Sequence, residues 1–327
     1  MRKLILFFLI VSSSVASAQL YKFESPFAHT YSIVAKDPVT GEMAVAVQSH
    51  WFSVGSVVSW GEAGVGVVAT QSFVNKSFGM RGLQLIKEGK TAQEALDILL
   101  STDEGREVRQ VAILDVHGNV ATHTGDNCIK YAGHIKGDHF SVQANMMLTD
   151  DVWPAMAAAY QINNELPLPE RMIAVLEAAE QAGGDIRGKQ SAALLVVAGE
   201  EPENAWDDPM IDLRVDDSEQ PLKELKRLLK VYRAYEHMNK GDLEVEHGDM
   251  KAAMEEYGAA QKMFPDNLEM AYWTAITLAN QGKLKEAKPI LKRVFAKDEN
   301  WKELTRRLPE AGLLTLSEEE LQEIMDL

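Results

Sequence analysis

The feature that most constrains the fold is a change of pattern near residue 200. Up to about Gly199, β-type runs alternate with helical runs, whereas everything after about Pro221 has the pattern of helices. The first part has the order strands, two helices, strands, two helices and a closing strand. Because strands and helices do not alternate singly, a doubly wound sheet is disfavoured. The order predicts an α+β chain: a four-layer α-β-β-α sandwich followed by an all-α helical repeat domain.

The expected elements of the first part follow from periodicity and turn signals. The β-type runs are TYSIVAKD, EMAVAVQSH, SVGSVVSW, GVGVVATQ, the hairpin VRQVAILDVHGNVATHT, HFSVQANMML and QSAALLVVAGE. Helices are expected at 79–88, 91–100, 151–161 and 169–182. Thr91 and Glu94 have the spacing of a capping box, which indicates a helix start. The last β-type run opens as a continuous apolar segment, so we expect it to be buried on both faces.

The helical part repeats itself at an offset of 34 residues. HGDMKAAMEEYGAAQKMFPD aligns with QGKLKEAKPILKRVFAKDEN, which pairs Gly248 with Gly282, Ala253 with Ala287 and Tyr257 with Leu291. This period is similar to that of tetratricopeptide repeats, and residues 313–327 are expected to cap the array. Two roles stay open: a helical hairpin that stabilises the first domain, or a surface that binds a protein partner.

The first residues have the pattern of a secretory signal. MRKLILFFLIVSSSVASAQ combines a basic start, a short apolar run and a small-residue exit. The expected division is a signal peptide at 1–18, a lead or propeptide at 19–29, the sandwich domain at 30–222 and the helical domain at 223–327. We therefore expect export to the periplasm or the medium, without a membrane span. Without the signal the chain has 31 basic and 49 acidic residues, a net charge of −18, which excludes nucleic acid as a partner.

Thr30 opens the first expected strand, and two roles fit its position. A threonine there is usually a β-former. It is a nucleophile if its own α-amino group is free, because an amine with a pKa near ~8 serves as a base at neutral pH. Cleavage of the signal leaves QLYKFESPFAH in front of Thr30. The second role therefore requires another cut, between His29 and Thr30.

Several blocks resemble a bacterial family called domain of unknown function 1028. They are TYSIVAKDPVTGEMAVAVQSHWFSVGS, GVGVVATQ, HTGDNCIKYAGH, PLPERMIAVLEAAEQAGGDIRGKQSAALLVV and IDLRVDDSEQPLKELKRLL, within about residues 30–235. The resemblance implies an N-terminal-nucleophile hydrolase-like fold, which is an α-β-β-α sandwich, and makes Thr30 the candidate nucleophile. In many relatives the first block directly follows the initiator Met, whose removal would expose the threonine. Here a signal and a lead precede it, so either the chain is processed or the amine-base mechanism does not operate.

Other candidate catalytic residues lie at expected strand ends. Gln143 and Asn145 share one face of their strand, because alternate strand residues point the same way. Their amides are candidate oxyanion donors, unless they satisfy loop backbone groups instead. His50 ends the second strand near Thr30 and is the candidate base for a variant without chain cleavage.

The candidate substrate-binding residues are Ser49, Gln71, Asp185, Arg187 and Gln190. Ser49 and Gln71 end expected strands, and the other three lie in GGDIRGKQS, a turn from helix to strand. Arg187 either pairs with Asp185 or binds a substrate carboxylate through its two-pronged guanidinium.

A metal site and a cofactor are not expected. The possible ligands within one short span are His123, Asp126, Cys128, His134 and His139, and their spacing matches no tight zinc pattern. Cys128 has no evident paired base, and GVGVV lacks the features of a phosphate loop.

The sequence therefore predicts an exported N-terminal-nucleophile hydrolase acting on an amide or related C–N bond of a small substrate. The alternative is a non-catalytic ligand- or partner-binding protein on the same fold. A homodimer is compatible with both.

Overall fold

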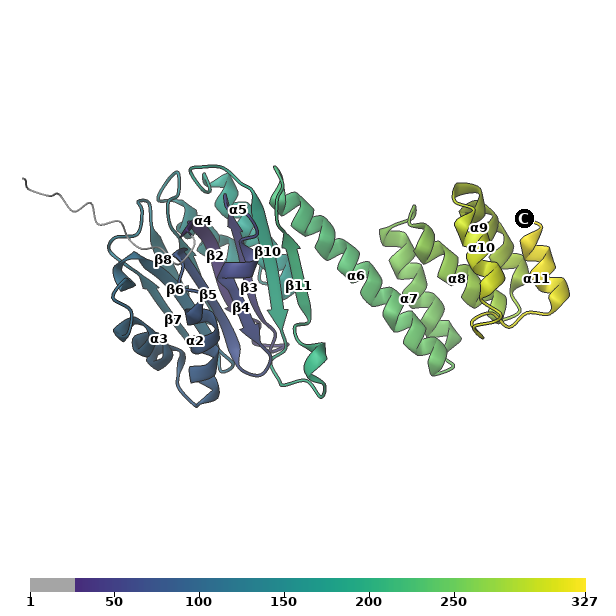
Figure 1. Cartoon of the computed structure of the whole chain (residues 1–327), viewed down its shortest axis with the longest axis horizontal. Coiled ribbons are helices and arrows are strands. Elements are labelled where there is room, and N and C mark those ends of the chain that lie inside the picture. Colours follow the sequence, from purple (N-terminus) through teal and green to yellow (C-terminus); the bar gives the residue numbers. More distant parts are fainter. Residues whose placement is uncertain (1–26) are drawn as a thin grey trace, which may run out of the picture.

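The computed structural model describes residues 27–327. The expected signal peptide at 1–18 and most of the expected lead lie outside the described residues. In Figure 1 a layered domain is joined through the long helix α6 to a row of shorter helices that ends at the C-terminus.

Two antiparallel sheets lie face to face in the first domain. One sheet has the order β1 (Phe27–Ala28), β5 (Gly66–Phe73), β6 (Arg109–Asp115) and β7 (Val120–Thr124), and β4 (Ser59–Glu62) also pairs with β5. The other has the order β11 (Ile211–Val215), β10 (Ser191–Val197), β3 (Met43–Ser49), β2 (Thr30–Lys36), β9 (Phe140–Ala144) and β8 (Gly133–Gly137). Inward-facing residues of both sheets, such as Val34, Val45, Val67 and Leu114, form one apolar cluster between them.

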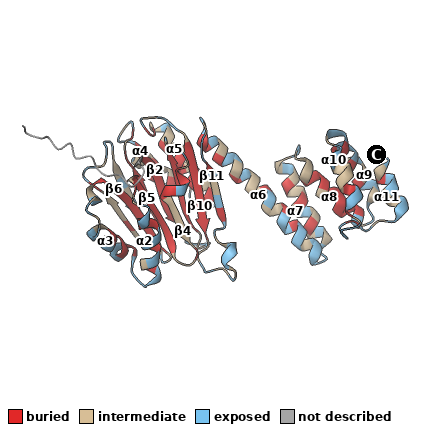
Figure 2. Cartoon of the chain, viewed as in Figure 1, coloured by how far each residue is buried: buried red, intermediate tan, exposed pale blue. Residues whose placement is uncertain are grey.

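Helix pairs cover the two outer faces. On the first sheet, α2 (Ser77–Lys87) and α3 (Ala92–Ser101) bury Phe78 and Leu96 against Ile113. On the second sheet, α4 (Val152–Ile162) and α5 (Leu168–Gln181) bury Met156 and Leu176 against Ile33. Figure 2 shows the buried strands enclosed by helices with exposed outer faces. The predicted α-β-β-α sandwich is therefore confirmed.

Most of the expected elements are present, including two that were argued from specific residues. Thr91 caps α3 through the predicted capping box with Glu94. Every residue of β10 is buried, as its continuous apolar pattern predicted. The strand expected in HFSVQANMML ends at Ala144, and Met146 shortly beyond it has a positive φ of 60°.

The expectation of a strand over SVGSVVSW was wrong except at its last two residues. Residues Gly55–Val58 form a short helix, α1, and β4 begins only at Ser59. Gly55 lies so close to Ala193 of β10 that a Cβ would collide with it, while Val57 and Val58 are buried. A short apolar run has no periodicity that separates these two structures. The short strands β1, β8 and β11, and the 3-10 turns Arg106–Val108 and Ala205–Asp207, were not anticipated.

The helical repeat is confirmed at its predicted offset. α7 (Met250–Met263) and α9 (Leu284–Lys297) begin and end 34 residues apart, and α8 (Leu268–Asn280), α10 (Asn300–Arg307) and α11 (Glu318–Met325) complete the array. The paired glycines, Gly248 and Gly282, have φ values of +78° and +70°. The paired core positions Ala253, Ala287, Tyr257 and Leu291 are buried.

The two domains share one helix. α6 (Pro221–Glu246) runs for 26 residues without interruption, so the boundary expected after residue 222 falls in its first turn. Leu225 and Leu229 belong to the core under the second sheet, whereas Ala234 and Met238 pack with Tyr257 of α7. Each half of α6 therefore contributes to a different core.

Two helical glycines should respond oppositely to substitution by alanine. A Cβ at Gly79 in α2 would collide with the ring of Trp60, whereas a Cβ at Gly258 in α7 meets no atom within 4 Å. We expect Gly79→Ala to lower the free energy of unfolding by about 1–3 kcal/mol. We expect Gly258→Ala to raise it by about 0.5–1 kcal/mol, because alanine favours the helix. Denaturant unfolding of both variants measures the difference, and equal effects would contradict the packing described for α2.

Candidate functional site

Thr30 begins β2 at one end of the space between the sheets. It lies directly opposite Ser49 of β3, and its hydroxyl donates to the carbonyl oxygen of Ala28 at 2.7 Å. By strand alternation, Thr30 and Ser32 face the same way as Val34, which belongs to the inter-sheet cluster. The layer between the sheets is thus apolar along most of its length and polar at the end that holds Thr30.

Buried amide side chains connect the two sheets in this polar layer. Gln71 Nε2 donates to the carbonyl of Thr30 at 3.2 Å and to Gln110 Oε1 at 2.6 Å. Ser32 Oγ donates to Gln71 Oε1, and Gln143 Nε2 donates to Ser32 Oγ, both at 2.6 Å. All of these residues are fully buried. Because a buried polar group is costly unless it is hydrogen-bonded, this network fixes the start of β2 against the opposite sheet.

Asn145 contacts both residues that flank the peptide bond before Thr30. Its backbone N–H donates to the carbonyl of Thr30 at 3.1 Å, and its Nδ2 donates to Gln110 Oε1 at 2.9 Å. Its Oδ1 lies 2.7 Å from His29 Nδ1. Gln143, the other predicted oxyanion donor, contacts Ser32 instead. The structure therefore brings Asn145, but not the Gln143 amide, to the bond between residues 29 and 30.

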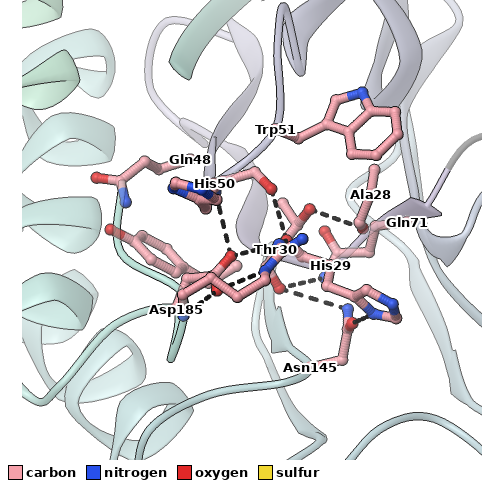
Figure 3. Close-up of polar contacts among 12 residues, drawn as sticks. Ala28, His29, Thr30, Gln48, His50, Trp51, Gln71, Asn145 and Asp185 are labelled. Atoms are coloured by element: carbon pink, nitrogen blue, oxygen red, sulfur yellow. Dashed lines mark hydrogen bonds and ion pairs between the residues drawn. The ribbon is translucent and has the colours of Figure 1, made fainter. Parts of the chain in front are cut away.

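The carbonyl of His29 accepts two strong hydrogen bonds. Ser49 Oγ donates to it at 2.5 Å and Arg187 Nη2 at 2.8 Å. Arg187 is held in turn by Asp185, with Nη2–Oδ2 at 2.6 Å and Nε–Oδ1 at 3.0 Å. Figure 3 shows Asp185, His29 and Thr30 converging at this point. Two donors, one of them cationic, thus polarise the carbonyl of the bond that precedes Thr30.

His29 is itself enclosed. It is 1% exposed, and its ring meets the ring of Phe73 edge-on at 5.4 Å. Burial lowers the pKa of His29 and is the largest effect, while the hydrogen bond with Asn145 opposes it. The charge of Arg187 lowers the pKa by a smaller amount, and that of Asp185 raises it by less again. The imidazole is therefore uncharged at neutral pH.

The remaining predicted site residues lie around this centre without reaching Thr30. His50 is exposed beyond the end of β3 and donates its backbone N–H to Asp185 at 3.1 Å. Gln190 is partly exposed, and its side chain donates to Asp217 at 3.1 Å. Ser49, Gln71, Asp185 and Arg187 belong to the site through the contacts described above.

Three residues of the site have no role in the sequence-based prediction. His29 marks only the position of the expected cut, and Ser32 and Gln110 are not among the predicted site residues. Gln110 had a usable signal, because it is an amide on the same strand face as the apolar residues Ala112 and Leu114.

A cavity of about 620 Å³ adjoins the polar layer. It is lined by Thr124, Gly125, Asp126, Cys128, Lys130, Ala132, Gly133 and His134. Gln110 Nε2 donates to Thr124 Oγ1 at 2.9 Å and to the carbonyl of Gly133 at 3.2 Å, so the lining is bonded directly to the network beneath Thr30.

Two of the three histidines considered as metal ligands make other contacts. His123 Nε2 lies 2.8 Å from the carbonyl of Arg106, and His134 Nδ1 lies 2.8 Å from Thr124 Oγ1. Burial raises the pKa of the Cys128 thiol. Within residues 27–327, no group of three or more His, Cys, Asp or Glu side chains is arranged to hold a metal ion. The helices of that same range include none with the length and apolarity needed to cross a membrane.

Comparisons with known proteins agree with both parts of this architecture. The family of unknown function DUF1028 matches residues 30–225, and a tetratricopeptide repeat family matches residues 244–308. A similar solved structure is that of protein SPO2555 from Silicibacter pomeroyi, assigned to DUF1028. It has 31% sequence identity and a TM-score of 0.56, over 62% of this chain and 88% of that one. None of the curated proteins matches. Since the family match begins at Thr30 and covers well over half of the chain, the protein belongs to the DUF1028 family and carries tetratricopeptide-like repeats after it.

Proposed function

We propose that the protein is an exported hydrolase of the N-terminal-nucleophile type, which cleaves an amide or related C–N bond with Thr30 as its nucleophile. The observation that carries this proposal is the pair of hydrogen bonds from Ser49 and Arg187 to the carbonyl of His29. Donors aimed at a carbonyl beside a hydroxyl are the arrangement that stabilises a tetrahedral intermediate. The four-layer sandwich and the position of Thr30 at a strand start, between the sheets, support it.

The first step is cleavage of the chain before Thr30. Thr30 Oγ adds to the carbonyl carbon of His29, while the carbonyl oxygen takes up negative charge between Ser49 and Arg187. The C–N bond to Thr30 then breaks, and the hydroxyl proton passes to the departing nitrogen. This leaves an ester between His29 and Thr30 Oγ. Water hydrolyses the ester, which yields the carboxylate of His29 and a chain that begins at Thr30.

The second step repeats the chemistry on a substrate. The freed α-amino group of Thr30 takes the proton of its own hydroxyl, as a base with a pKa near ~8 can do at neutral pH. Thr30 Oγ attacks the substrate carbonyl, the C–N bond breaks and the protonated amine departs. Water then releases the acyl group. Ser49 and Arg187 are the donors for the oxyanion, so Arg187 acts on the reacting carbonyl rather than on a distant substrate carboxylate. Asn145, which was expected to be an oxyanion donor, instead holds the carbonyl of Thr30 and the side chain at position 29.

The proposal is tested by the N-terminus of the full-length protein after expression and purification. We expect intact mass and N-terminal sequencing to show a chain that begins at Thr30, recovered from the exported fraction. Thr30→Ala should accumulate the uncut chain. A wild-type chain that begins at Gln19, with no fraction beginning at Thr30, would overturn the amine-base mechanism.

The helical repeats support a second activity alongside the first. Tetratricopeptide-like arrays present extended surfaces to protein partners, and we propose such a partner for residues 244–308. If the whole protein were instead a non-catalytic binder on this fold, Thr30→Ala would leave its function unchanged.

A further inference from the structure

Residues 27–29 lie where any acyl group attacked by Thr30 must lie. We call the residues that contact this segment, from β5 and from Ser49, Asn145 and Arg187, its groove. Ala28 and His29 are buried, and the hydroxyl of Thr30 already donates to the carbonyl of Ala28. After cleavage this segment is the acyl product of the first reaction. Its contacts therefore describe how the site holds an acyl chain.

Backbone pairing fixes the direction of that chain. β1 pairs antiparallel with β5, with Phe27 opposite Phe73 and Ala28 opposite Ser72. An extended peptide added to a sheet edge in this way is recognised through its main chain, whatever its side chains. The groove thus favours a peptide over a small amide without a backbone.

The surroundings of Ala28 and His29 then determine which side chains fit at these two positions of a bound peptide. Ala28 belongs to the apolar cluster between the sheets, where only a small side chain has room. The ring of His29 lies between the amide oxygen of Asn145, at 2.7 Å, and the ring of Phe73. That pocket suits a planar side chain that can donate a hydrogen bond, because an apolar one would leave the buried Asn145 oxygen without this partner.

We propose that this groove is the acyl-side subsite of the enzyme, and that its substrate is an extended peptide with a small residue followed by a planar, hydrogen-bonding residue such as histidine at the cleaved bond. The inference rests on the proposed hydrolase and deepens it. The carbonyl of the histidine takes the place between Ser49 and Arg187, and the new N-terminus of the departing fragment leaves as the amine.

The groove is tested by peptide binding, which does not require catalysis. In a full-length Ala28→Gly, His29→Gly, Thr30→Ala chain, which stays uncut and does not hydrolyse the peptide, the segment loses its side-chain contacts. Because glycine is ordered at the largest entropic cost, a free peptide can compete for the groove. We expect calorimetry to show binding of acetyl-Phe-Ala-His-amide, with acetyl-Phe-Ala-Leu-amide about tenfold weaker or worse. The Thr30→Ala chain, which stays uncut and keeps its own segment in the groove, should bind neither. Equal binding of the two peptides, or binding of neither by the variant, would overturn the inference.

A second measurement covers the case in which the glycine variant is unstable. In the same Thr30→Ala background, His29→Ala empties only the ring pocket. We expect 4-methylimidazole to raise the melting temperature of this variant but not that of Thr30→Ala alone. An equal shift in both chains, or no shift in the variant, would count against the pocket.

The two proposals fail separately. A chain correctly cut before Thr30 that does not bind the histidine peptide overturns the subsite alone. An uncut, inactive chain whose glycine variant still binds it overturns the hydrolase and leaves a peptide-binding groove.

Discussion

Thr30→Ala should abolish both chain cleavage and amide hydrolysis, with a loss of about 10³-fold or more in rate, because no other group in the proposed mechanism supplies the attacking oxygen. The fold should tolerate the change. The Thr30 hydroxyl donates one hydrogen bond, to the carbonyl of Ala28, and a typical bond of this kind contributes about 1 kcal/mol. Intact mass follows cleavage, and a fluorogenic peptide ending in Ala-His follows hydrolysis.

The chain contains a matched control for this substitution. Thr274 in α8 is also buried and donates to a backbone carbonyl, that of Met270, at the same 2.7 Å. Thr274→Ala should therefore cost similar stability and leave both activities unchanged. Thr30→Ser should keep a measurable fraction of both. Full activity in Thr30→Ala would show that Thr30 is only a β-forming residue at the start of β2 and has no catalytic role.

Arg187→Ala should lower the free energy of unfolding by about 3–5 kcal/mol. The side chain of Asp185 is 0% exposed, so removing the guanidinium leaves a buried carboxylate with only backbone N–H partners. The same variant should slow cleavage before Thr30 by about 10²–10³-fold, because it removes one of the two donors to the carbonyl of His29. Denaturant unfolding and timed mass spectrometry measure the two effects.

Arg214 provides the comparison. It forms an ion pair with Asp212, two residues earlier, in which Nε donates to Oδ1 at 2.7 Å and Nη2 donates to Oδ2 at 2.8 Å. Arg187 and Asp185 have the same arrangement. Both partners are substantially exposed, and exposed ion pairs contribute about 0–1 kcal/mol. Arg214→Ala should thus change stability little and leave cleavage unaltered. Equal losses of stability in Arg187→Ala and Arg214→Ala would show that the burial of Asp185 does not strengthen its ion pair.

Local patterns were sufficient to predict the layers of the fold and the repeat. The grouping of strands and helices predicted the sandwich. The hairpin of β2 and β3 predicted that the end of β3 lies near Thr30, and the structure places Ser49 opposite it. The offset of 34 residues located α7 and α9 because each repeat is a self-similar helical unit.

Contacts between the two sheets could not be predicted from these local patterns. Gln71 and Gln110 reach Thr30 and Asn145 only after two sheets pack face to face, and periodicity does not set that alignment. The bond from Arg187 to the carbonyl of His29 joins residues 158 positions apart. The ion pair of Arg187 with Asp185 was among the predicted alternatives because those two residues are close in sequence.

The continuity of α6 determines where the protein can be divided. Leu225 and Leu229 complete the core beneath the second sheet, although both lie beyond residue 222. A fragment that stops at residue 222 would lack these two leucines and would expose the apolar core beneath the second sheet. Such a fragment should aggregate whether or not Thr30 is intact. A fragment extended through Tyr232, which also packs on that core, keeps the first module intact and exposes only the helix end that belongs to the second.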